Sequence, residues 1–439
     1  MAVALSVDAR LLGHSRDLRL LMGGRAISEL GNAIAAVGAA VQAYRMTHSS
    51  IAVGVLGMAA AVPMVTGMLA GGAIADAMDR RMIIVATQAA TGLVVAGLAL
   101  NAASGHPQLW LLFLLAAASG AAAGLGAPAR WAAVPALVPA DQLPAAAALN
   151  ATVSKAAGLA GPAIAGLIIA RLGVAAAFSA DAASYLIYAL MAARLRPLLP
   201  RGGGRRAGLG SFAEGLGYLR HDRLVAGLLI VDVTAMVFGM PSALFPAIAT
   251  GRFHGGAATV GLLYAAPAAG GLAGALTSGW IGRVRHAGRV LLVSALVWGL
   301  AICGFGLAPV LPVALAWLAL AGAGDLVSEV LRSSLLQLSI PDGLRGRLSA
   351  LWLAQANAAP ALGNLEAGGV AAISTPAISV VSGGLACVLG VALLAVLCPA
   401  PRRARLWERN GHDDNGGPRA GATDVAPTGA GARGVLVRA

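Results

Sequence analysis

The sequence is short of charged residues and almost free of lysine. Asp, Glu, Lys and Arg make up only 11% of its 439 residues, whereas 58% are hydrophobic. Soluble globular domains carry about 25% charged residues, so this composition excludes an ordinary soluble fold and points to lipid as the solvent. Lys155 is the single lysine beside thirty arginines, a bias to which we attach no function by itself.

Cysteine and histidine are too few and too scattered to build a metal or catalytic centre. Cys303, Cys387 and Cys398 lie in apolar stretches, at spacings that suit neither a disulfide framework nor a zinc site. The seven histidines are spread over expected loops and termini, and no phosphate-loop spacing appears. We therefore expect no enzyme activity, no metal and no cofactor.

Aromatic residues and signal-peptide features are also scarce. Only 4% of residues are aromatic, and the basic residues behind the net charge of +13 do not form a polar segment with interleaved aromatics. We therefore expect no nucleic-acid partner. The first nineteen residues contain several charges and no long apolar run, so no cleavable signal peptide is evident and the first hydrophobic helix must direct targeting.

Long apolar runs recur through the chain. A spanning helix needs about 20 mostly apolar residues to cross about 30 Å of hydrocarbon. Runs of this kind fall at approximately 20–44, 52–75, 82–102, 108–128, 146–170, 174–194, 224–250, 257–280, 288–307, 310–331, 348–372 and 376–399. We predict an all-α integral membrane protein of about twelve transmembrane helices in two six-helix halves.

Arginine is distributed unequally over the loops between these runs. One set of alternate loops carries most of the arginines, and the other carries only Arg45, Arg171 and Arg252. Positive charge is retained on the cytoplasmic side of a membrane. We predict a multi-pass protein of the inner or plasma membrane with both termini in the cytoplasm, which requires an even number of spans.

Polar stretches divide the chain into five parts. The longest internal one, 196–223, contains Arg-Gly-Gly-Gly-Arg-Arg and separates six runs from six. The end of the chain is rich in Gly, Ala, Pro and charge, and cannot bury enough apolar surface to fold alone. We expect a cytoplasmic N-terminal segment at 1–19, six-helix halves at 20–195 and 224–400, a cytoplasmic linker at 196–223 and a disordered cytoplasmic tail at 401–439.

A short internal repeat supports two related halves. Arg130 is followed nine residues later by Pro139-Ala140-Asp141, and Arg332 is followed nine residues later by Pro341-Asp342. We expect each Arg to end the fourth helix of its half. Repeated halves with a substrate site at their interface are typical of secondary transporters.

A motif stands between the second and third apolar runs. The sequence Gly72-Ala73-Ile74-Ala75-Asp76-Ala77-Met78-Asp79-Arg80-Arg81 resembles the Gly-x-x-x-Asp-Arg-x-Gly-Arg-Arg signature of the major facilitator superfamily. Two positions depart from it, because Ala77 replaces the usual first basic residue and Asp79 the usual Gly. This form resembles the branch of enterobactin exporters and macrolide efflux proteins, over about residues 18–400.

The resemblance implies a conformational latch. Gly72 would permit close helix approach, Asp76 would bind a helix N-terminus or an Arg, and Arg80 and Arg81, with Arg130, would hold the cytoplasmic face. The corresponding loop of the second half keeps basic residues but has no Asp at the latch position. We interpret it as a degenerate copy.

The fifth apolar run contains a second motif of small residues. Gly158, Gly161, Pro162 and Gly166 resemble the Gly-Pro signature of superfamily antiporters, which favours export. Packing of small residues between helices explains the same pattern equally well. The Arg found midway along the fourth helix of many proton antiporters is absent near Gly120, so other ionisable groups would have to carry proton coupling.

A few ionisable residues lie inside the apolar runs. An ionised side chain at helix centre costs at least about 2.5–3.5 kcal/mol, so such residues are functional candidates. Arg25 and Glu29 are four residues apart on one face of the first helix, with Asn32 nearby, and Asp232 lies in the corresponding seventh helix. We rank Glu29 and Asp232 as the leading carboxylates for proton handling.

Lys155, Asp181, Asp325, Glu329 and Glu366 form a second group of candidates. Glu329 lies three residues before Arg332, which favours an ordinary ion pair between them. Asp325 lies deeper on the same face. Lys155 could snorkel to the cytoplasmic surface, and Asp181 could be a packing residue.

These features predict a secondary transporter, most simply a proton-coupled exporter of small organic molecules such as siderophores, antibiotics or drug-like compounds. It would act by alternating access as a monomer, with a small-molecule substrate, membrane lipid and protons as partners. A lysolipid or other solute transporter of the same fold is an alternative, as is a non-transporting membrane scaffold or receptor, since fold does not fix substrate.

Overall fold

The computed structural model describes residues 15–199, 217–220, 222–340 and 345–404, and these ranges contain helices and no strand. The first six spans are α2 (Arg16–Thr47), α3 (Ser50–Ala77), α4 (Arg80–Ala103), α5 (Leu109–Leu137), α6 (Leu143–Leu172) and α7 (Val174–Ala193). The others are α9 (Arg223–Phe238) with α10 (Phe245–Gly251), α11 (Ala257–Leu276), α12 (Ala287–Leu307), α13 (Leu311–Ser339), α14 (Arg345–Ile373) and α15 (Pro376–Leu397). Short helices η1 (Ala140–Gln142), η2 (Ser242–Leu244), η3 (Ser278–Arg283) and α16 (Pro399–Arg403) lie between or after them.

The predicted membrane fold is confirmed. In the part of the chain that the structure describes, eleven segments are long and apolar enough to cross a membrane. The place of the remaining predicted span, 348–372, is taken by α14, which is 29 residues long but carries Gln355, Asn364 and Glu366. Its polar residues lower its hydropathy while its neighbours in the bundle remain apolar.

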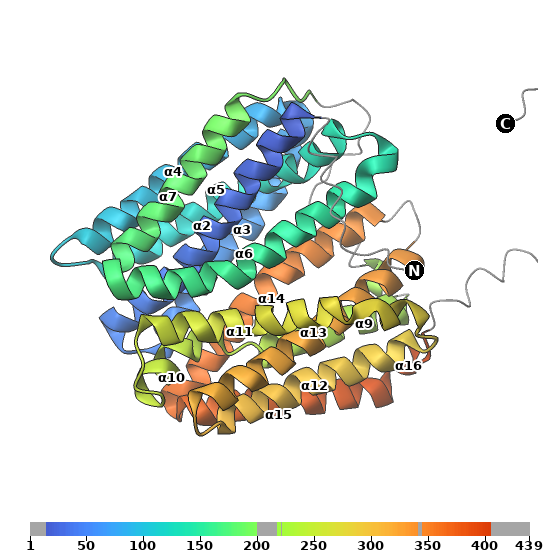
Figure 1. Cartoon of the computed structure of the whole chain (residues 1–439). Helices are drawn as coiled ribbons and strands as arrows, with labels where there is room; N and C mark the ends of the chain where they lie inside the picture. The colour runs from blue at the N-terminus through green and yellow to red at the C-terminus, as the bar shows by residue number, and fades with distance from the viewer. Residues whose placement is uncertain (1–14, 200–216, 221, 341–344, 405–439) are drawn as a thin grey trace, which may run out of the picture. The chain divides into compact units, whose positions relative to one another are not determined.

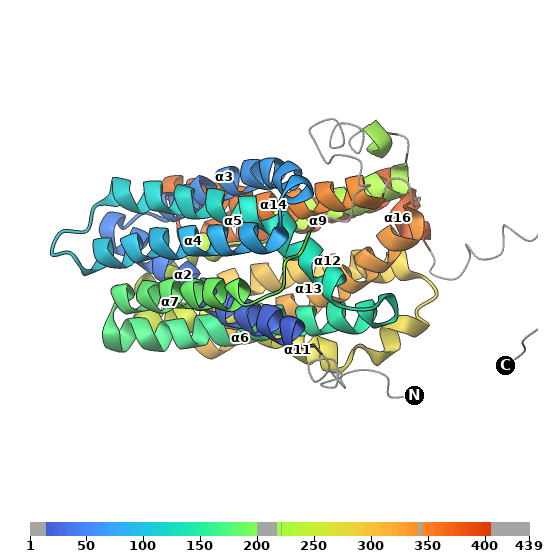
Figure 2. The ribbon, with the colours of Figure 1, turned by 90° about the horizontal axis from the view of Figure 1, so that it is seen from above.

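The helices form two groups with the same internal arrangement (Figure 1). In each group the second helix packs on the fourth, as α3 on α5 and α11 on α13, and the third packs on the sixth, as α4 on α7 and α12 on α15. Between the groups, α3 packs on α14 and α6 packs on α11 (Figure 2). The second helix of each group thus meets the fifth of the other, which is the pairing that two related halves produce.

Small residues bring the helix backbones together. A methyl group added at Gly120 or Gly124 of α5 would overlap the carbonyl oxygens of Ala60 and Met64 in α3. Lipid tails are as apolar as leucine, so helices in a membrane associate through such close packing rather than through exclusion of water. In the second half, Gly270 of α11 and Gly322 of α13 make equally close contacts with the carbonyl oxygens of Ala319 and Pro267.

The close backbone contacts between the halves lie at one end of the bundle. Gly54, in the first turns of α3, leaves no room for a side chain beside the backbone of Asn364 in α14. Gly166, near the end of α6, also lies close to the backbone of Ala257 and Ala258 at the start of α11. This end carries the turn at His48, and the motif loop around Met78 is at the other end.

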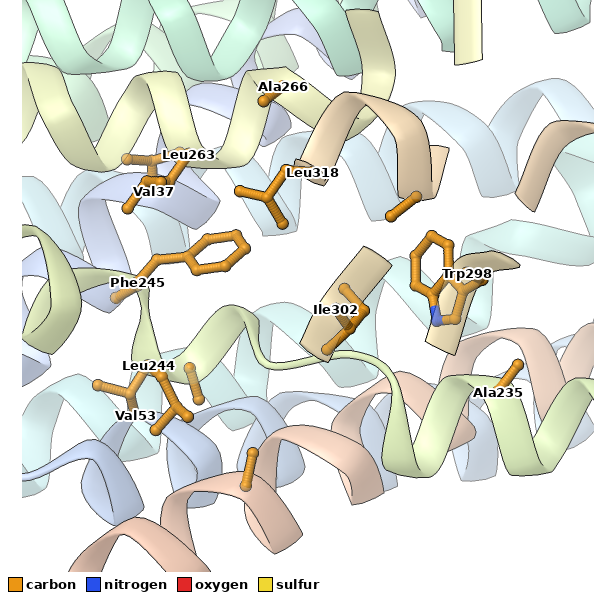
Figure 3. Close-up of a cluster of buried hydrophobic side chains, with 14 of the residues drawn as sticks. Val37, Val53, Ala235, Leu244, Phe245, Leu263, Ala266, Trp298, Ile302 and Leu318 are labelled. Carbon is orange, nitrogen blue, oxygen red and sulfur yellow. The ribbon is translucent and has the colours of Figure 1, made fainter. Parts of the chain in front are cut away.

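An apolar cluster joins helices of both halves (Figure 3). Val37 of α2 and Val53 of α3 come from the first half, and Phe245, Leu263 and Trp298 come from the second. The Phe245 ring meets the Tyr264 ring edge-on at a centroid distance of 4.9 Å. Aromatic pairs of this geometry add to the energy of apolar packing.

The seventh span is interrupted, and not continuous as expected for 224–250. The helix α9 stops at Phe238, and the chain resumes helical form through η2 and α10. Pro241 lacks an amide hydrogen and so cannot continue the helical ladder. Asn364 of α14 stabilises the interruption, because its Oδ1 accepts hydrogen bonds from the Ser242 hydroxyl and the Ala243 amide, both at 2.7 Å.

Candidate transport site

The first half contains an ion pair within one helix. The Arg25 guanidinium lies 3.1 Å from the Glu29 carboxylate, as their spacing of four residues on α2 indicates. Arg25 also stacks over the Trp131 ring, with 5.7 Å between its guanidinium carbon and the ring centroid. Both charges are thereby held inside the first half.

Arg130 lies within α5 rather than at its end, since the helix continues to Leu137. Its guanidinium donates to the carbonyl of Ala123 at 2.8 Å and to Gln88 Oε1 of α4 at 3.4 Å. The Gln88 amide in turn donates to the Ser28 hydroxyl of α2 at 3.4 Å. Arg130 therefore links three helices, and the expectation that it terminates the fourth helix is wrong.

The second half contains a buried ion pair between helices. Asp232 of α9 and Arg332 of α13 approach to 2.9 Å, and their side chains are only 5% and 7% exposed. Gln355 of α14 donates a hydrogen bond to the other oxygen of Asp232, Oδ2, at 2.8 Å. The expected pairing of Glu329 with Arg332 is wrong, because Arg332 pairs with Asp232 and Glu329 with Lys155. The expectation that Arg332 ends the fourth helix of its half is also wrong, because α13 continues to Ser339.

The two arginines of the sequence repeat occupy corresponding places. Each lies seven residues before the end of the fourth helix of its half, and each is linked to the first helix of that half. Arg332 makes this link directly to Asp232, whereas Arg130 reaches Ser28 through Gln88. The repeat is thus present in side-chain contacts as well as in helix order.

Lys155 joins the two halves. Its ammonium on α6 lies 2.8 Å from the Glu329 carboxylate on α13, with side chains 57% and 36% exposed. Lys155 lies about 18 Å from the start of α6 and Glu329 about 15 Å from the end of α13, at 1.5 Å per helical residue. The pair is therefore near mid-depth, and Lys155 is directed at the opposite half.

Asp325 lies one helical turn before Glu329 and is partly buried. Within the ranges that the structure describes, no hydrogen bond or ion pair reaches its carboxylate. Asp325 and Glu329 share a face of α13 because they are four residues apart. The second half thus offers two carboxylates beside the lysine of the first.

Two further candidates lie within the first half. Asp181 of α7 is 2% exposed, and it accepts a hydrogen bond from the Ser184 hydroxyl at 3.3 Å. Its carboxylate packs against Gly31 of α2, which favours the packing role. Asn32 is exposed on α2 and accepts from the Tyr185 hydroxyl at 3.4 Å.

The motif loop is tied to the segment after α7. Asp79 caps α4 by accepting from the Arg81 amide at 2.9 Å, and it also accepts from the Leu198 amide at 2.8 Å. Arg80 donates to the carbonyl of Ala132, and Arg81 to that of Ala193. The loop is anchored wholly within its own half.

Asp76 and Gly72 occupy the last turns of α3. The Asp76 side chain is exposed, and it has no hydrogen bond or ion pair to any residue in the described ranges. Gly72 is partly buried. Its neighbour Gly71 provides the close approach to α5, since a methyl group there would overlap the Leu125 carbonyl.

The small residues of α6 lie at two helix interfaces. Gly161 contacts Ala33 of α2, while Pro162 and Gly166 lie against Gly261 and Ala258 of α11 in the other half. Gly158 has open space beside it. The geometry accounts for Gly161, Pro162 and Gly166 as packing residues at and near the boundary between the halves.

Sequence reasoning missed several partners. Gln88 and Gln355 are amides on otherwise apolar helices, and such residues usually bond to something inside a bundle. That signal could have marked them as candidates. The departure at Asp79 could have been interpreted as a helix cap, because Asp is a preferred residue directly before a helix.

A small cavity lies between α9, α13 and α14, next to the Asp232 pair. It measures about 150 Å³ and is lined by Val225, Leu229, Ser333, Leu336, Gln337, Ile340, Leu348 and Trp352. Ligand pockets usually measure about 300–1,000 Å³. This cavity alone is therefore too small to hold a drug-sized substrate.

Comparison with known proteins places the chain in a family. Residues 16–410 match the family described as transmembrane secretion effectors. The enterobactin exporter of Citrobacter koseri is 33% identical over 399 residues, covering 91% of this chain and 96% of the exporter. The protein belongs to the transmembrane secretion effectors. The enterobactin exporter of Shigella boydii is 34% identical over 392 residues, covering 89% of this secretion effector and 94% of that protein.

Solved structures share the fold of this secretion effector at low sequence identity. A nucleoside transporter superposes with a TM-score of 0.66 and 12% identity, covering 86% of this chain and 99% of that one. A bacterial homologue of the lysosomal transporter Spinster, captured inward-facing, gives 0.64 and 16%, with coverage of 88% and 96%. The secretion effector therefore has the major facilitator fold.

These findings confirm the predicted class. The secretion effector is a multi-pass membrane transporter of small molecules and not an enzyme, as its family and its exporter relatives indicate. Its resemblance to the enterobactin exporter branch is likewise confirmed.

Proposed function

We propose that this secretion effector exports small organic molecules from the cytoplasm by alternating access, driven by inward movement of protons. The observation that carries the proposal is the Lys155–Glu329 pair, a mid-depth ion pair between two halves that elsewhere meet through close glycine contacts and apolar side chains. Charges inside a membrane are costly, so those that are present are usually paired or mark a transport pathway. An ion pair between moving halves can form in one conformation and break in the other.

The distribution of contacts supports alternating access. The close backbone contacts between the halves lie at the His48 end, as at Gly54 and Gly166. We propose that this is the external end, closed in the present conformation. The exposed Asp76 would then be a latch that engages only when the cytoplasmic end closes, with Arg80 and Arg81 holding the loop in place.

Glu29 and Asp232 remain our proposed carboxylates for proton handling, one in each half. Each has an arginine partner in its own half, Arg25 and Arg332 respectively. A ligand shifts a conformational equilibrium only by its differential affinity for the two states. Proton binding at these carboxylates would therefore have to weaken the pairing in one state more than in the other.

We propose a siderophore-like substrate, because the relatives at 33–34% identity are named enterobactin exporters. A different drug-like molecule or a lysolipid is the alternative within the same fold. We further propose a single chain as the functional unit in the lipid membrane.

Transport can be tested with the purified full-length protein in proteoliposomes. Enterobactin is the probe, and its uptake through inside-out protein would be followed with and without an imposed proton gradient. We expect enterobactin to accumulate in the lumen against its concentration gradient, and this accumulation should be lost when a protonophore is added. Empty liposomes are the control for leakage. The Asp76→Asn variant, changed in the proposed latch, should show a reduced rate.

Each outcome of that assay is informative. Flux of enterobactin without dependence on the proton gradient would refute coupling but keep transport. Absence of flux for enterobactin and for a panel of drug-like and lysolipid probes would favour the scaffold or receptor alternative.

A further inference from the structure

The Lys155–Glu329 contact has an unbalanced charge next to it. The charged groups that act electrostatically on Asp325 are Arg332 and Glu329 on its own helix, Lys155 on α6 and Asp232 on α9. Asp232 and Arg332 neutralise one another in their 2.9 Å pair. One ammonium and two carboxylates remain.

A cluster of one ammonium and two carboxylates carries a net charge of −1 when all three groups are ionised. Burying a net charge in a low-dielectric region is opposed by desolvation, whereas a neutral cluster is enclosed at much lower cost. One added proton makes this cluster neutral. Uptake of a single proton therefore lowers the desolvation cost of enclosing the cluster between the helices.

The proton also decides which carboxylate pairs with the lysine. If Glu329 takes the proton, its ion pair with Lys155 loses its Coulomb attraction, and Asp325 remains as the ionised partner one turn away on α13. No covalent bond changes, and the proton moves only onto a carboxylate oxygen. The link between the halves is thereby broken or shifted along α13.

We propose that Lys155, Glu329 and Asp325 form the coupling site, in which one proton releases the ion pair that joins the halves in this conformation. This inference rests on the proposed function, since it names the site where proton binding acts. It adds a site between the halves to Glu29 and Asp232, which pair within their own halves. Asp325, which has no ion pair in the described residues, is the carboxylate that can then receive Lys155.

The test needs no substrate. Spin labels at Met78→Cys and Leu276→Cys report the distance between the halves at the motif-loop end, because Met78 follows α3 and Leu276 ends α11, and both are exposed. Cys303→Ser, Cys387→Ser and Cys398→Ser remove the native thiols. The distance in the full chain, held in phospholipid nanodiscs, would be measured by pulsed electron paramagnetic resonance between about pH 5 and about pH 9.

We expect the mean distance to shorten at low pH in the otherwise unaltered chain, because release of the pair lets this end close. Glu329→Gln and Asp325→Asn should each abolish at least half of that change. Asp17→Asn is the matched control, since it removes an ion pair of 3.9 Å to Arg196 that lies within the first half, and it should leave the change intact.

A charge exchange keeps the test decisive where a single variant folds poorly. Lys155→Glu combined with Glu329→Lys restores an ion pair between the halves and should recover the distance distribution that either single exchange disturbs. The inference is overturned if the distance is independent of pH, or if Asp325→Asn and Glu329→Gln retain the full change while Glu29→Gln or Asp232→Asn loses it. In either case the proteoliposome flux still decides separately whether export is proton-coupled.

Discussion

The carboxylate of Asp79 accepts a hydrogen bond from the backbone amide of Leu198, at 2.8 Å, across 119 positions of the sequence. The same oxygen caps α4 through the Arg81 amide. The amide and carbonyl of Leu198 both bond to the motif loop, the carbonyl by accepting from the Arg80 amide at 3.2 Å. One acidic side chain therefore fixes the α3–α4 turn to the segment that follows α7.

Asp79→Ala should destabilise the first half. Loss of a helix cap costs about 1 kcal/mol, and the Leu198 amide loses its partner as well, so we expect a total of roughly 2 kcal/mol. The measurement is the midpoint of thermal unfolding in detergent. Asp79→Asn retains an acceptor oxygen and should recover most of the loss; equal destabilisation by both variants would contradict this role.

Asp76→Asn should behave differently from Asp79→Ala, although the two positions are close in sequence. Asp76 is exposed and has no polar contact in the described residues, so its removal should leave the unfolding midpoint and the expression level unchanged. Transport should nevertheless fall several-fold if Asp76 engages in the opposite conformation. The comparison is transport rate per unit of folded protein. Parallel loss of transport and folded protein would make Asp76 structural.

Separating Asp232 from Arg332 should be among the most damaging changes in the second half. Arg332→Gln leaves a buried carboxylate without its cation, and breaking a buried pair costs roughly 3–5 kcal/mol. Combining Arg332→Gln with Asp232→Asn removes both charges and should restore much of the stability. A double-mutant cycle on thermal stability measures the coupling. Additive effects of the two changes would show that the contact contributes little.

The fold was largely predictable from the sequence, whereas the pairing of the charged residues was not. Apolar runs, the motif at Asp76 and the repeat of Arg130 and Arg332 were sufficient for the membrane fold and its two related halves. The ion pair of Arg25 with Glu29 follows from helical spacing alone. Periodicity could therefore predict contacts within a helix.

Contacts between helices depend on rotation and depth, which periodicity leaves open. Glu329 was expected to pair with Arg332, three residues away, but each pairs with a residue on another helix, Lys155 and Asp232. The break in the seventh span was missed for a related reason. Proline inside a membrane helix is often tolerated, as at Pro162, and the amide of Asn364 that stabilises the break at Pro241 lies more than a hundred residues away.

The orientation in the membrane is a separate prediction, which rests on the arginines of the loops. Two arginines counted for it from the sequence lie inside the helix bundle. Arg332 is paired inside the second half and Arg130 bonds within α5 and α4, so neither counts as a loop charge. The asymmetry remains without them. The loop at Arg80 and Arg81 is basic, and the loops at the other end carry single arginines such as Arg45.

Cysteine accessibility can decide this orientation in intact cells. His48→Cys and Ser104→Cys, both at exposed turns, should react with a membrane-impermeant maleimide added outside. Gly203→Cys in the linker and Gly411→Cys in the tail should react only after the cells are permeabilised, because positive charge keeps those segments in the cytoplasm. A chain without native cysteines gives the background. External labelling of Gly411→Cys would reverse the predicted orientation. It would also place Asp76 and the motif loop at the external face, which would contradict the proposal that Asp76 is a latch on the cytoplasmic side.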